Sequence, residues 1–351
     1  MNFASDNASP AHPNVIEAIS RANHDFVGSY GSDPIMQRVR QQIRDIFEAP
    51  DAAVYLVATG SAANALALAT YCPPWGAVYC HDVSHIEMDE CGAPEFYTGG
   101  AKLAKISGAH AKIDPDALEH ALASAAAVGV HNVQRGMLSL SNVTELGACY
   151  SADELSALCG LAKQYDLPVH LDGARFANAL VATGATPAEL SWRAGVDVLS
   201  FGGTKNGLMG VEAVVMFDPA KAWEFELRRK RGGHLFSKHR YLSAQMEAYL
   251  TDGLWLEMAG QANAMGSALA EGLGASNVAH LLHPADANMI FVSLPAGRHR
   301  AAQEAGAVFY PLPPHRGFDG PEDAMIPARL VASWCTSKAD VAGYLSAIAA
   351  A

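Results

Sequence analysis

The sequence predicts an α/β fold in which a large domain, built on a mostly parallel sheet covered by helices, precedes a smaller α+β domain. The chain has 351 residues, which is more than one ordinary hydrophobic core needs. Apolar runs of strand length alternate with helical stretches, as in parallel sheets that are buried on both faces. From about residue 279 short strands alternate with helices instead. We therefore expect a large domain over residues 1–235, with the N-terminal segment, and a smaller domain over residues 236–351.

Each element follows from a local pattern. Asp33 can cap a helix that has Pro34 at its first position, and the apolar residues of 35–46 fall on one face. A second helix start is Ser151, which has capping-box spacing to Glu154. Apolar runs predict large-domain strands at 52–59, 77–83, 136–143, 168–174, 196–203 and 212–218, and small-domain strands at 288–295, 307–313 and 328–334.

Composition limits the class of protein. The net charge of −12 argues against nucleic acid or an anionic membrane surface as the main partner. The sequence lacks an apolar run of roughly 18 residues, and its start lacks the pattern of a secretory signal. The six cysteines are scattered without metal-ligand spacing, so we expect buried free thiols, no metal site and a cytoplasmic protein.

A glycine turn follows the first predicted strand. The letters ATGSAAN, residues 58–64, end a strand and begin a helix, which places free N–H groups beside the hydroxyls of Thr59 and Ser61. Such a turn suits a phosphate, although many similar loops bind nothing. It has neither the lysine of a nucleoside triphosphate loop nor the GxGxxG pattern of a dinucleotide site.

Two further strand ends carry a carboxylate and an amine. Asp172 ends the strand in VHLDGAR, and Lys205 stands in SFGGTKNG after the next strand. Taken separately, Asp172 could simply cap a helix and Lys205 could be a solvated loop residue. The strand ends of a parallel sheet meet at one edge, so these residues and the glycine turn should converge there. Together they offer phosphate donors, a partner for a pyridine nitrogen and a Schiff-base amine, which is what pyridoxal 5'-phosphate requires.

A histidine and a basic run each allow more than one interpretation. His85 follows another strand end, where an imidazole could stack on a planar cofactor and move protons, or could simply bond to the backbone. Residues 228–240 hold six of the 24 lysines and arginines. In an acidic protein this run fits a solvated helix end or a local anion site better than a nucleic-acid surface.

With these residues in place, the chain resembles the low-specificity L-threonine aldolases, which are fold-type-I pyridoxal phosphate enzymes of the beta-eliminating lyase/threonine aldolase family. The resemblance covers nearly the whole chain. It rests on FASDN, GSYGSDP, TGSAAN, SHIEMDECG, HLDGARFANAL, SFGGTKNG, KRGGHLFSK and ARLVASW. The most specific part is HLDGAR in the right order with the downstream lysine.

The resemblance implies roles for the cofactor residues. Lys205 would bind the cofactor covalently, Asp172 would pair with its pyridine nitrogen, and His85 would stack on its ring. The phosphate would be held by the glycine turn of Thr59, Gly60 and Ser61, and the remaining cofactor contacts are expected from Arg175 and Thr204.

The resemblance also implies substrate and partner contacts. Ser5, Arg175 and Arg329 resemble the family's binders of the substrate carboxylate, and Tyr30 matches its active-site tyrosine. In such enzymes the site lies at a dimer interface, and we expect a homodimer or homotetramer. Basic residues would reach the neighbour's phosphate there, with Lys238, Arg228 and Arg231 as the candidates.

Three departures from the family pattern stand out. The frequent Ser-Lys-Gly is Thr204, Lys205 and Asn206 here, which keeps the hydroxyl and alters the turn. A second active-site histidine of many members is replaced by Thr144, which leaves His85, directly or through water, as the expected base. The basic run lacks the usual Gly-Met-Arg.

These observations predict a carbon–carbon lyase that reversibly cleaves L-threonine, L-allo-threonine and related L-β-hydroxy-α-amino acids to glycine and an aldehyde. A β-eliminating lyase or an aminotransferase of the same fold is the nearest alternative. A non-catalytic anion-binding protein is a more distant one.

Overall fold

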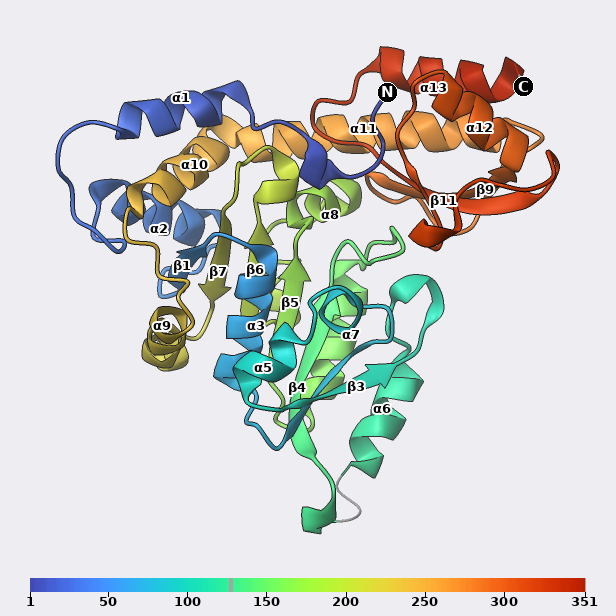
Figure 1. Ribbon diagram of the computed structural model, residues 1–351. Helices are drawn as coiled ribbons and strands as arrows, with labels where there is room; N and C mark the ends of the chain where they lie inside the picture. Colours follow the sequence, from blue (N-terminus) through green and yellow to red (C-terminus); the bar gives the residue numbers. More distant parts are fainter. Residues whose placement is uncertain (126–128, 351) are drawn as a thin grey trace.

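The computed structural model describes residues 1–125 and 129–350 (Figure 1). In this part of the chain the large sheet has seven strands in the order β1-β7-β6-β5-β4-β2-β3. Its strands are β1 (Ala53–Val57), β2 (Gly76–His81), β3 (Lys102–Ile106), β4 (Gln134–Ser141), β5 (Val169–Gly173), β6 (Val198–Gly202) and β7 (Glu212–Met216). The neighbours from β6 to β3 pair in parallel, and β7 is antiparallel to both β6 and β1. The predicted α/β fold class is confirmed.

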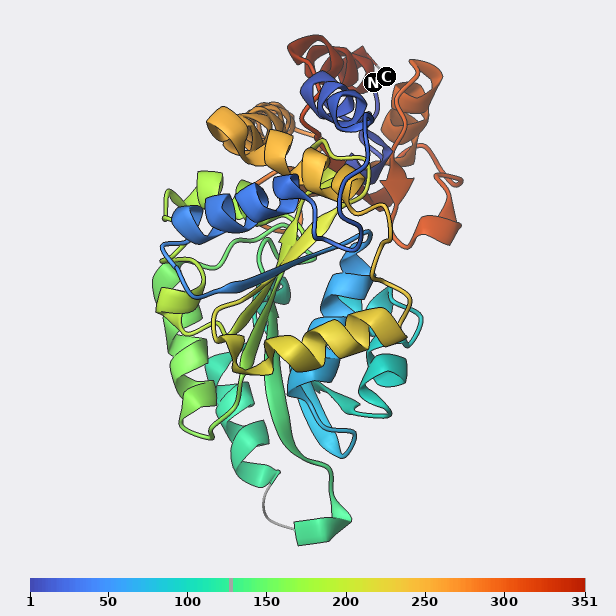
Figure 2. The same cartoon turned by 90° about the vertical axis from the view of Figure 1, so that its left-hand side faces the viewer.

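Helices cover both faces of this sheet, and Figure 2 shows α3 and α7 on opposite sides of it. One face carries α3 (Gly60–Tyr71), α5 (Ala93–Thr98) and α9 (Ala222–Arg231). The other carries α2 (Pro34–Ile46), α6 (Pro115–Ser124), α7 (Ala152–Lys163), α8 (Phe176–Thr183) and α10 (Arg240–Leu250). The strands therefore bury side chains on both faces, which explains why they are apolar throughout.

The two helix starts predicted from the sequence are confirmed. Asp33 Oδ1 accepts the N–H of Met36 at 2.8 Å, and Pro34 occupies the first turn of α2. Ser151 and Glu154 form a reciprocal capping box at the start of α7. These caps satisfy N–H groups that would otherwise lack partners at the helix ends.

A second, smaller sheet lies at the other end of the molecule. Its antiparallel order is β10-β11-β9-β8. The elements here are α11 (Leu254–Gly274), β8 (His280–Leu281), β9 (Met289–Pro295), α12 (Ala296–Glu304), β10 (Tyr310–Pro311), β11 (Met325–Val331) and α13 (Lys338–Ala350). The chain's first residues join this part, because the N–H of Phe3 donates to the Val308 carbonyl at 2.8 Å and Phe3 is buried in its core.

Two helices connect the two parts. The helix α10 packs on α2 and on α1 (Pro13–Ala22), and its buried side chains belong to the core of the large sheet. The following helix α11 contributes to that core with its first half and to the core of the small sheet with its second half. The division at residues 235 and 236 stays a prediction.

Two properties concern the chain as a whole. Among the described residues, no helix combines the length and apolar character needed to cross a membrane. All six cysteines are free, as expected, but burial was predicted wrongly for Cys91 and Cys335, which are exposed because they lie in turns outside the helices and strands.

Candidate active site

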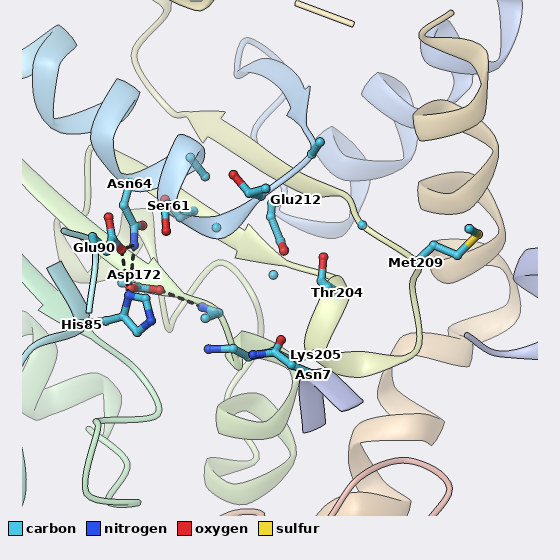
Figure 3. A pocket seen from close by; sticks show the side chains of 18 residues that line it. Asn7, Ser61, Asn64, His85, Glu90, Asp172, Thr204, Lys205, Met209 and Glu212 are labelled. Atoms are coloured by element: carbon cyan, nitrogen blue, oxygen red, sulfur yellow. Dashed lines mark hydrogen bonds and ion pairs between the residues drawn. The ribbon is translucent and has the colours of Figure 1, made fainter. Parts of the chain in front are cut away.

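A cavity of about 380 Å³ lies where β1, β2, β5 and β6 end and β7 begins (Figure 3). Side chains from the sheet edge and from the helices that follow it face this space. Of the residues predicted from the sequence, it is lined by Thr59, Gly60, Ser61, His85, Asp172, Thr204 and Lys205. The strand ends therefore converge as the parallel order requires.

The glycine turn forms one wall of the cavity. Thr59 caps α3, and its Oγ1 accepts the N–H of Ala62 at 3.2 Å. The first N–H groups of a helix have no acceptor within the helix, so those of Gly60 and Ser61 are free to bind a ligand. A Cβ built on Gly60 meets nothing within 4 Å, which shows that the chain leaves this corner open.

Asp172 is buried at the end of β5 as an anion. Its Oδ1 accepts the N–H of Ala174 at 3.0 Å, and its Oδ2 accepts from the Asn64 side chain at 2.8 Å. Burial opposes ionisation, yet the nearby His170, Lys205 and His85 and the Ala174 N–H hold the pKa of Asp172 below its ordinary value. A carboxylate that stays charged can keep a ring nitrogen protonated.

A buried histidine, His170, lies two residues before Asp172 on the same strand. His170 Nδ1 contacts the Ser139 hydroxyl at 2.9 Å and Nε2 contacts the Ser200 hydroxyl at 3.0 Å. Burial lowers the pKa of His170 to about 4. The charge of Asp172 opposes this shift.

His85 begins α4 (His85–Met88), and 29% of its side chain is exposed. Its Nδ1 lies 2.9 Å from Oε1 of Glu90, whose side chain is fully buried. This hydrogen bond raises the pKa of His85, although burial opposes the shift. Glu90 Oε1 also accepts from Asn64 at 2.9 Å, so Asn64 joins Glu90 to Asp172 (Figure 3).

Lys205 stands in a short 3₁₀ turn, Thr204–Asn206, after β6. Glu212 holds this turn, because its Oε2 accepts the N–H of Gly203 at 2.6 Å. Burial raises the pKa of Glu212, while hydrogen bonds from Thr204 and Gly203 and the charge of Lys205 oppose the rise. Glycine is also needed here for packing within the chain, since a Cβ on Gly202 would lie 2.4 Å from the Ala174 carbonyl oxygen.

Arg175 is paired with a residue that the sequence did not single out. Its Nε and Nη2 bind the two oxygens of Asp6 at 2.7 and 2.9 Å, in a bidentate pair that is almost fully buried. Burial alone would raise the pKa of Asp6, but Arg175, Lys205 and Asn288 hold it below its ordinary value. Arg175 does not line the cavity, and two of its nitrogens already have an acceptor.

Arg329 approaches the same pair from β11. Its Nη2 donates to the Ala4 carbonyl at 3.4 Å, and its buried Nε has no hydrogen-bond partner within the described chain. Burial and then the nearby charge of Arg175 lower its pKa. A buried guanidinium nitrogen without an acceptor suits an anion that is bound here.

Arg329, like Arg175, does not line the cavity, and the remaining predicted contacts also lie outside it. Ser5 caps a short 3₁₀ helix, Asp6–Ala8, and its neighbour Asn7 lines the cavity instead. Tyr30 and Lys238 are exposed and do not line the cavity, and the Tyr30 N–H donates to the Ser237 carbonyl at 3.0 Å. Arg228 and Arg231 line a second hollow, beside α5. Tyr30, Lys238, Arg228 and Arg231 do not line the cavity of their own chain.

Sequence reasoning missed several residues that line or support the cavity. They are Asp6, Asn7, Asn64, Glu90, Ser200, Met209 and Glu212. A signal existed for two of them, since Asn64 interrupts an Ala- and Leu-rich helix and Glu212 opens an apolar strand. Buried polar groups at such positions need partners, which is a reason to suspect a site.

The residues of the cavity fit pyridoxal phosphate. The open corner at Gly60 lies beside free N–H groups that suit a phosphate. Asp172 is an ionised carboxylate, and Lys205 supplies an amine in the same cavity. Donors, carboxylate and amine are the three groups that this cofactor requires.

Comparisons with known proteins agree with this chemistry. A family model described as beta-eliminating lyase matches residues 2–296. A low specificity L-threonine aldolase from a Pseudomonas species is 37% identical over 97% of this chain and 94% of its own length. The enzyme of the same name from Pseudomonas aeruginosa is 37% identical over 95% of this chain and 93% of its own.

Solved structures give the same picture. A threonine aldolase from Leishmania major has a TM-score of 0.91 and 27% identity, with 99% of this chain and 98% of that chain covered. A serine palmitoyltransferase from S. paucimobilis with bound PLP has a TM-score of 0.70 and 17% identity, with 100% and 86% covered. The second likeness shows the fold alone.

Proposed function

The chain belongs to the beta-eliminating lyase family, and we propose that it is a pyridoxal phosphate-dependent L-threonine aldolase of low specificity. Its reaction is the reversible cleavage of L-threonine, L-allo-threonine and related L-β-hydroxy-α-amino acids to glycine and an aldehyde. The observation that carries this proposal is the convergence of Lys205, Asp172 and the Thr59–Ser61 turn on one cavity. The 37% identity to enzymes named low specificity L-threonine aldolase supports it over nearly the whole chain.

We assign the cofactor as follows. Lys205 would bind it covalently, Asp172 would keep its ring nitrogen protonated, and the Thr59–Ser61 turn would hold its phosphate with Thr204 nearby. When bound, the cofactor supplies an electron sink for the pair released at Cα.

The chain's own residues prepare the substrate for cleavage. Arg329, with its unpartnered Nε, receives the substrate carboxylate, and Arg175 adds positive charge beside it. This contact fixes the direction of the Cα–Cβ bond within the cavity. His85 Nε2 removes the proton of the β-hydroxyl group, because Nδ1 is already engaged by Glu90.

A second copy of the chain completes the site in this proposal. Tyr30 and Lys238 are exposed, lie close together and do not line the cavity of their own chain, and we assign them to the neighbour's cavity in a homodimer or homotetramer. Arg228 or Arg231 could serve beside Lys238. We place this enzyme in the cytoplasm, where its exposed thiols of Cys91 and Cys335 would stay reduced.

The test measures products from L-threonine, L-allo-threonine and L-phenylserine in parallel, with the purified protein and added pyridoxal phosphate. We expect glycine and the matching aldehyde in equal amounts from each substrate, without any oxo acid in the assay. An oxo acid product from threonine, with no glycine, would instead indicate an eliminating lyase. Turnover that requires an added oxo acid would indicate an aminotransferase.

A further inference from the structure

Glu90 is a buried carboxylate at the edge of the cavity, and the proposed function uses its contact with His85 without explaining why a carboxylate is buried there. Its side chain is fully buried, and Oε1 accepts two hydrogen bonds, from His85 Nδ1 and Asn64 Nδ2, each 2.9 Å long. Its second oxygen, Oε2, is buried and has no partner in the described residues. Burying a carboxylate is costly, so its position needs an explanation.

The turn after α4 brings the Glu90 side chain back to the His85 ring. The Asp89 N–H donates to the His85 carbonyl at 2.9 Å, which closes the short helix. Cys91 and Gly92 then follow in the left-handed region, with φ of 51° and 74°. A non-glycine residue in this region costs energy unless its surroundings hold it there. The chain accepts this cost immediately after Glu90.

Asn64 extends the contact to the other side of the cavity. It is 2% exposed within α3, and its one amide nitrogen lies 2.9 Å from Glu90 Oε1 and 2.8 Å from Asp172 Oδ2. Each of the two amide hydrogens can thus reach a different carboxylate. Figure 3 shows the chain of contacts from His85 through Glu90 and Asn64 to Asp172.

The charges that face His85 come from four segments. Glu90 contacts it directly, and Glu145 and Asp172 add negative charge from the loop after β4 and from β5. Lys205 adds positive charge from the turn after β6. Of these groups, Glu90 is the one that bonds to Nδ1, so it decides which ring nitrogen carries the proton.

We propose that Glu90 is a positioning residue, held by Asn64, which keeps the proton of neutral His85 on Nδ1 and leaves Nε2 free to act as the base. This inference rests on the proposed function. In the cleavage step Nε2 would take the β-hydroxyl proton, the electron pair of the O–H bond would become the second bond of the aldehyde carbonyl, and the bound cofactor would accept the pair of the Cα–Cβ bond. The negative charge of Glu90 then stabilises the imidazolium that forms. Asn64, which donates to both Glu90 and Asp172, holds the two carboxylates in place.

The first experiment observes His85 directly in the cofactor-loaded enzyme. Imidazole ¹⁵N NMR of histidine-labelled protein reports the protonated nitrogen and the titration midpoint, and a His85→Asn variant assigns the signal. We expect Nδ1–H in the wild type and a midpoint that moves to lower pH in Glu90→Gln, because the negative charge is lost. The control Glu87→Gln changes an acid in the same segment that pairs with Lys105 instead. An unchanged midpoint in Glu90→Gln would overturn the proposal.

The second experiment asks whether Glu90 acts through His85. Glu90→Gln should lower kcat on threonine by about 10-fold or more, with KM nearly unchanged. The acidic limb of its pH profile should move to lower pH. In a His85→Asn background the same change should have no further effect, since residues that act as a unit are not additive. Equal losses in both backgrounds would contradict the assignment.

Two further outcomes remain decisive. If Glu90→Gln does not fold, Glu90→Asp carries the NMR test, because the shorter side chain retains the charge but withdraws from Nδ1. We expect the Nδ1–H signal to weaken, and an unaltered signal would overturn the proposal. If the cofactor-loaded wild type releases no glycine from threonine, the proposed function fails, whereas the titration of His85 still decides the role of Glu90.

Discussion

Asn206 shows how one residue can serve the site without touching it. It follows Lys205 where the family often has glycine, and the sequence offers no reason for it. In the structure it is 4% exposed, and its Nδ2 donates to the Tyr249 hydroxyl at 2.9 Å and to the Trp255 carbonyl at 2.8 Å. Asn206 therefore fastens the lysine turn to α10 and α11.

Replacing Asn206 by alanine should lower the free energy of unfolding by about 1 to 3 kcal/mol, because the buried Trp255 carbonyl loses its donor. Chemical denaturation followed by circular dichroism measures this. The exposed Asn277 provides the matched control, since Asn277→Ala should change stability by less than about 0.5 kcal/mol. Equal stability of the two variants would show that the fastening is unimportant.

The residues of the site differ in how well the sequence predicts them. Lys205, Asp172 and Thr59 follow strands, and parallel strands bring their ends to one edge whatever the details of packing. Glu90 and Asn64 act through hydrogen bonds between segments 26 residues apart. No local pattern specifies such a bond, so it becomes visible only in the folded chain.

At the scale of elements, the N-terminus of α3 is the part of the site with the most open space. Gly60 lines the cavity, and a Cβ there would meet no atom within 4 Å. The chain itself therefore tolerates a side chain at this position. A phosphate bound at this helix end would occupy the same space as the added side chain.

The substitution Gly60→Ala should leave the melting temperature unchanged or slightly higher and weaken pyridoxal phosphate binding by about 10-fold. Absorbance titration with the cofactor measures the affinity. Gly160→Ala is the control, because Gly160 lies within α7 and also has open space around its Cβ. Equal affinity of both variants would place the phosphate elsewhere.

The small sheet contains a pH-sensitive element of its own. His299 on α12 is fully buried, donates from Nε2 to the Ile326 carbonyl at 2.9 Å and stacks on Phe318 with centroids 4.3 Å apart. Burial lowers the pKa of His299 to about 4 from 6.5. Between pH 4 and pH 6.5, His299 is therefore protonated in the unfolded chain but neutral in the folded chain.

Stability should therefore fall as the pH drops from 6.5 to 4, by on the order of 3 kcal/mol from this residue. In His299→Gln that part of the decline should disappear, whereas His315→Gln, at an exposed position, should retain it. Denaturation at several pH values gives the two slopes. A wild-type slope in His299→Gln would contradict this assignment.

At the scale of the whole molecule, the alternation of strands and helices sufficed to predict the fold class. It could not predict that β7 runs antiparallel, because an apolar strand has the same pattern in either direction. It also did not predict that Phe3 packs with the small sheet, since that contact joins residues far apart in the chain. The pairing of Arg175 with Asp6 was missed for the same reason.

The exposed residues Tyr30 and Lys238 allow a test of the proposed dimer. Tyr30 and Lys238 do not line the cavity of their own chain, which is consistent with a site completed by a second copy. Mixing inactive Lys205→Ala with inactive Lys238→Ala chains, after dissociation and reassociation, should restore part of the activity in mixed dimers. No recovery in verified mixed dimers would contradict this assignment.

The most direct test of the central claim is the release of glycine and acetaldehyde from L-threonine by the cofactor-loaded wild type and by Lys205→Ala. The account predicts equal amounts of both products from the wild type, and a rate lower by about 1,000-fold or more in the variant even when cofactor is present. Turnover by Lys205→Ala at the wild-type rate would contradict it.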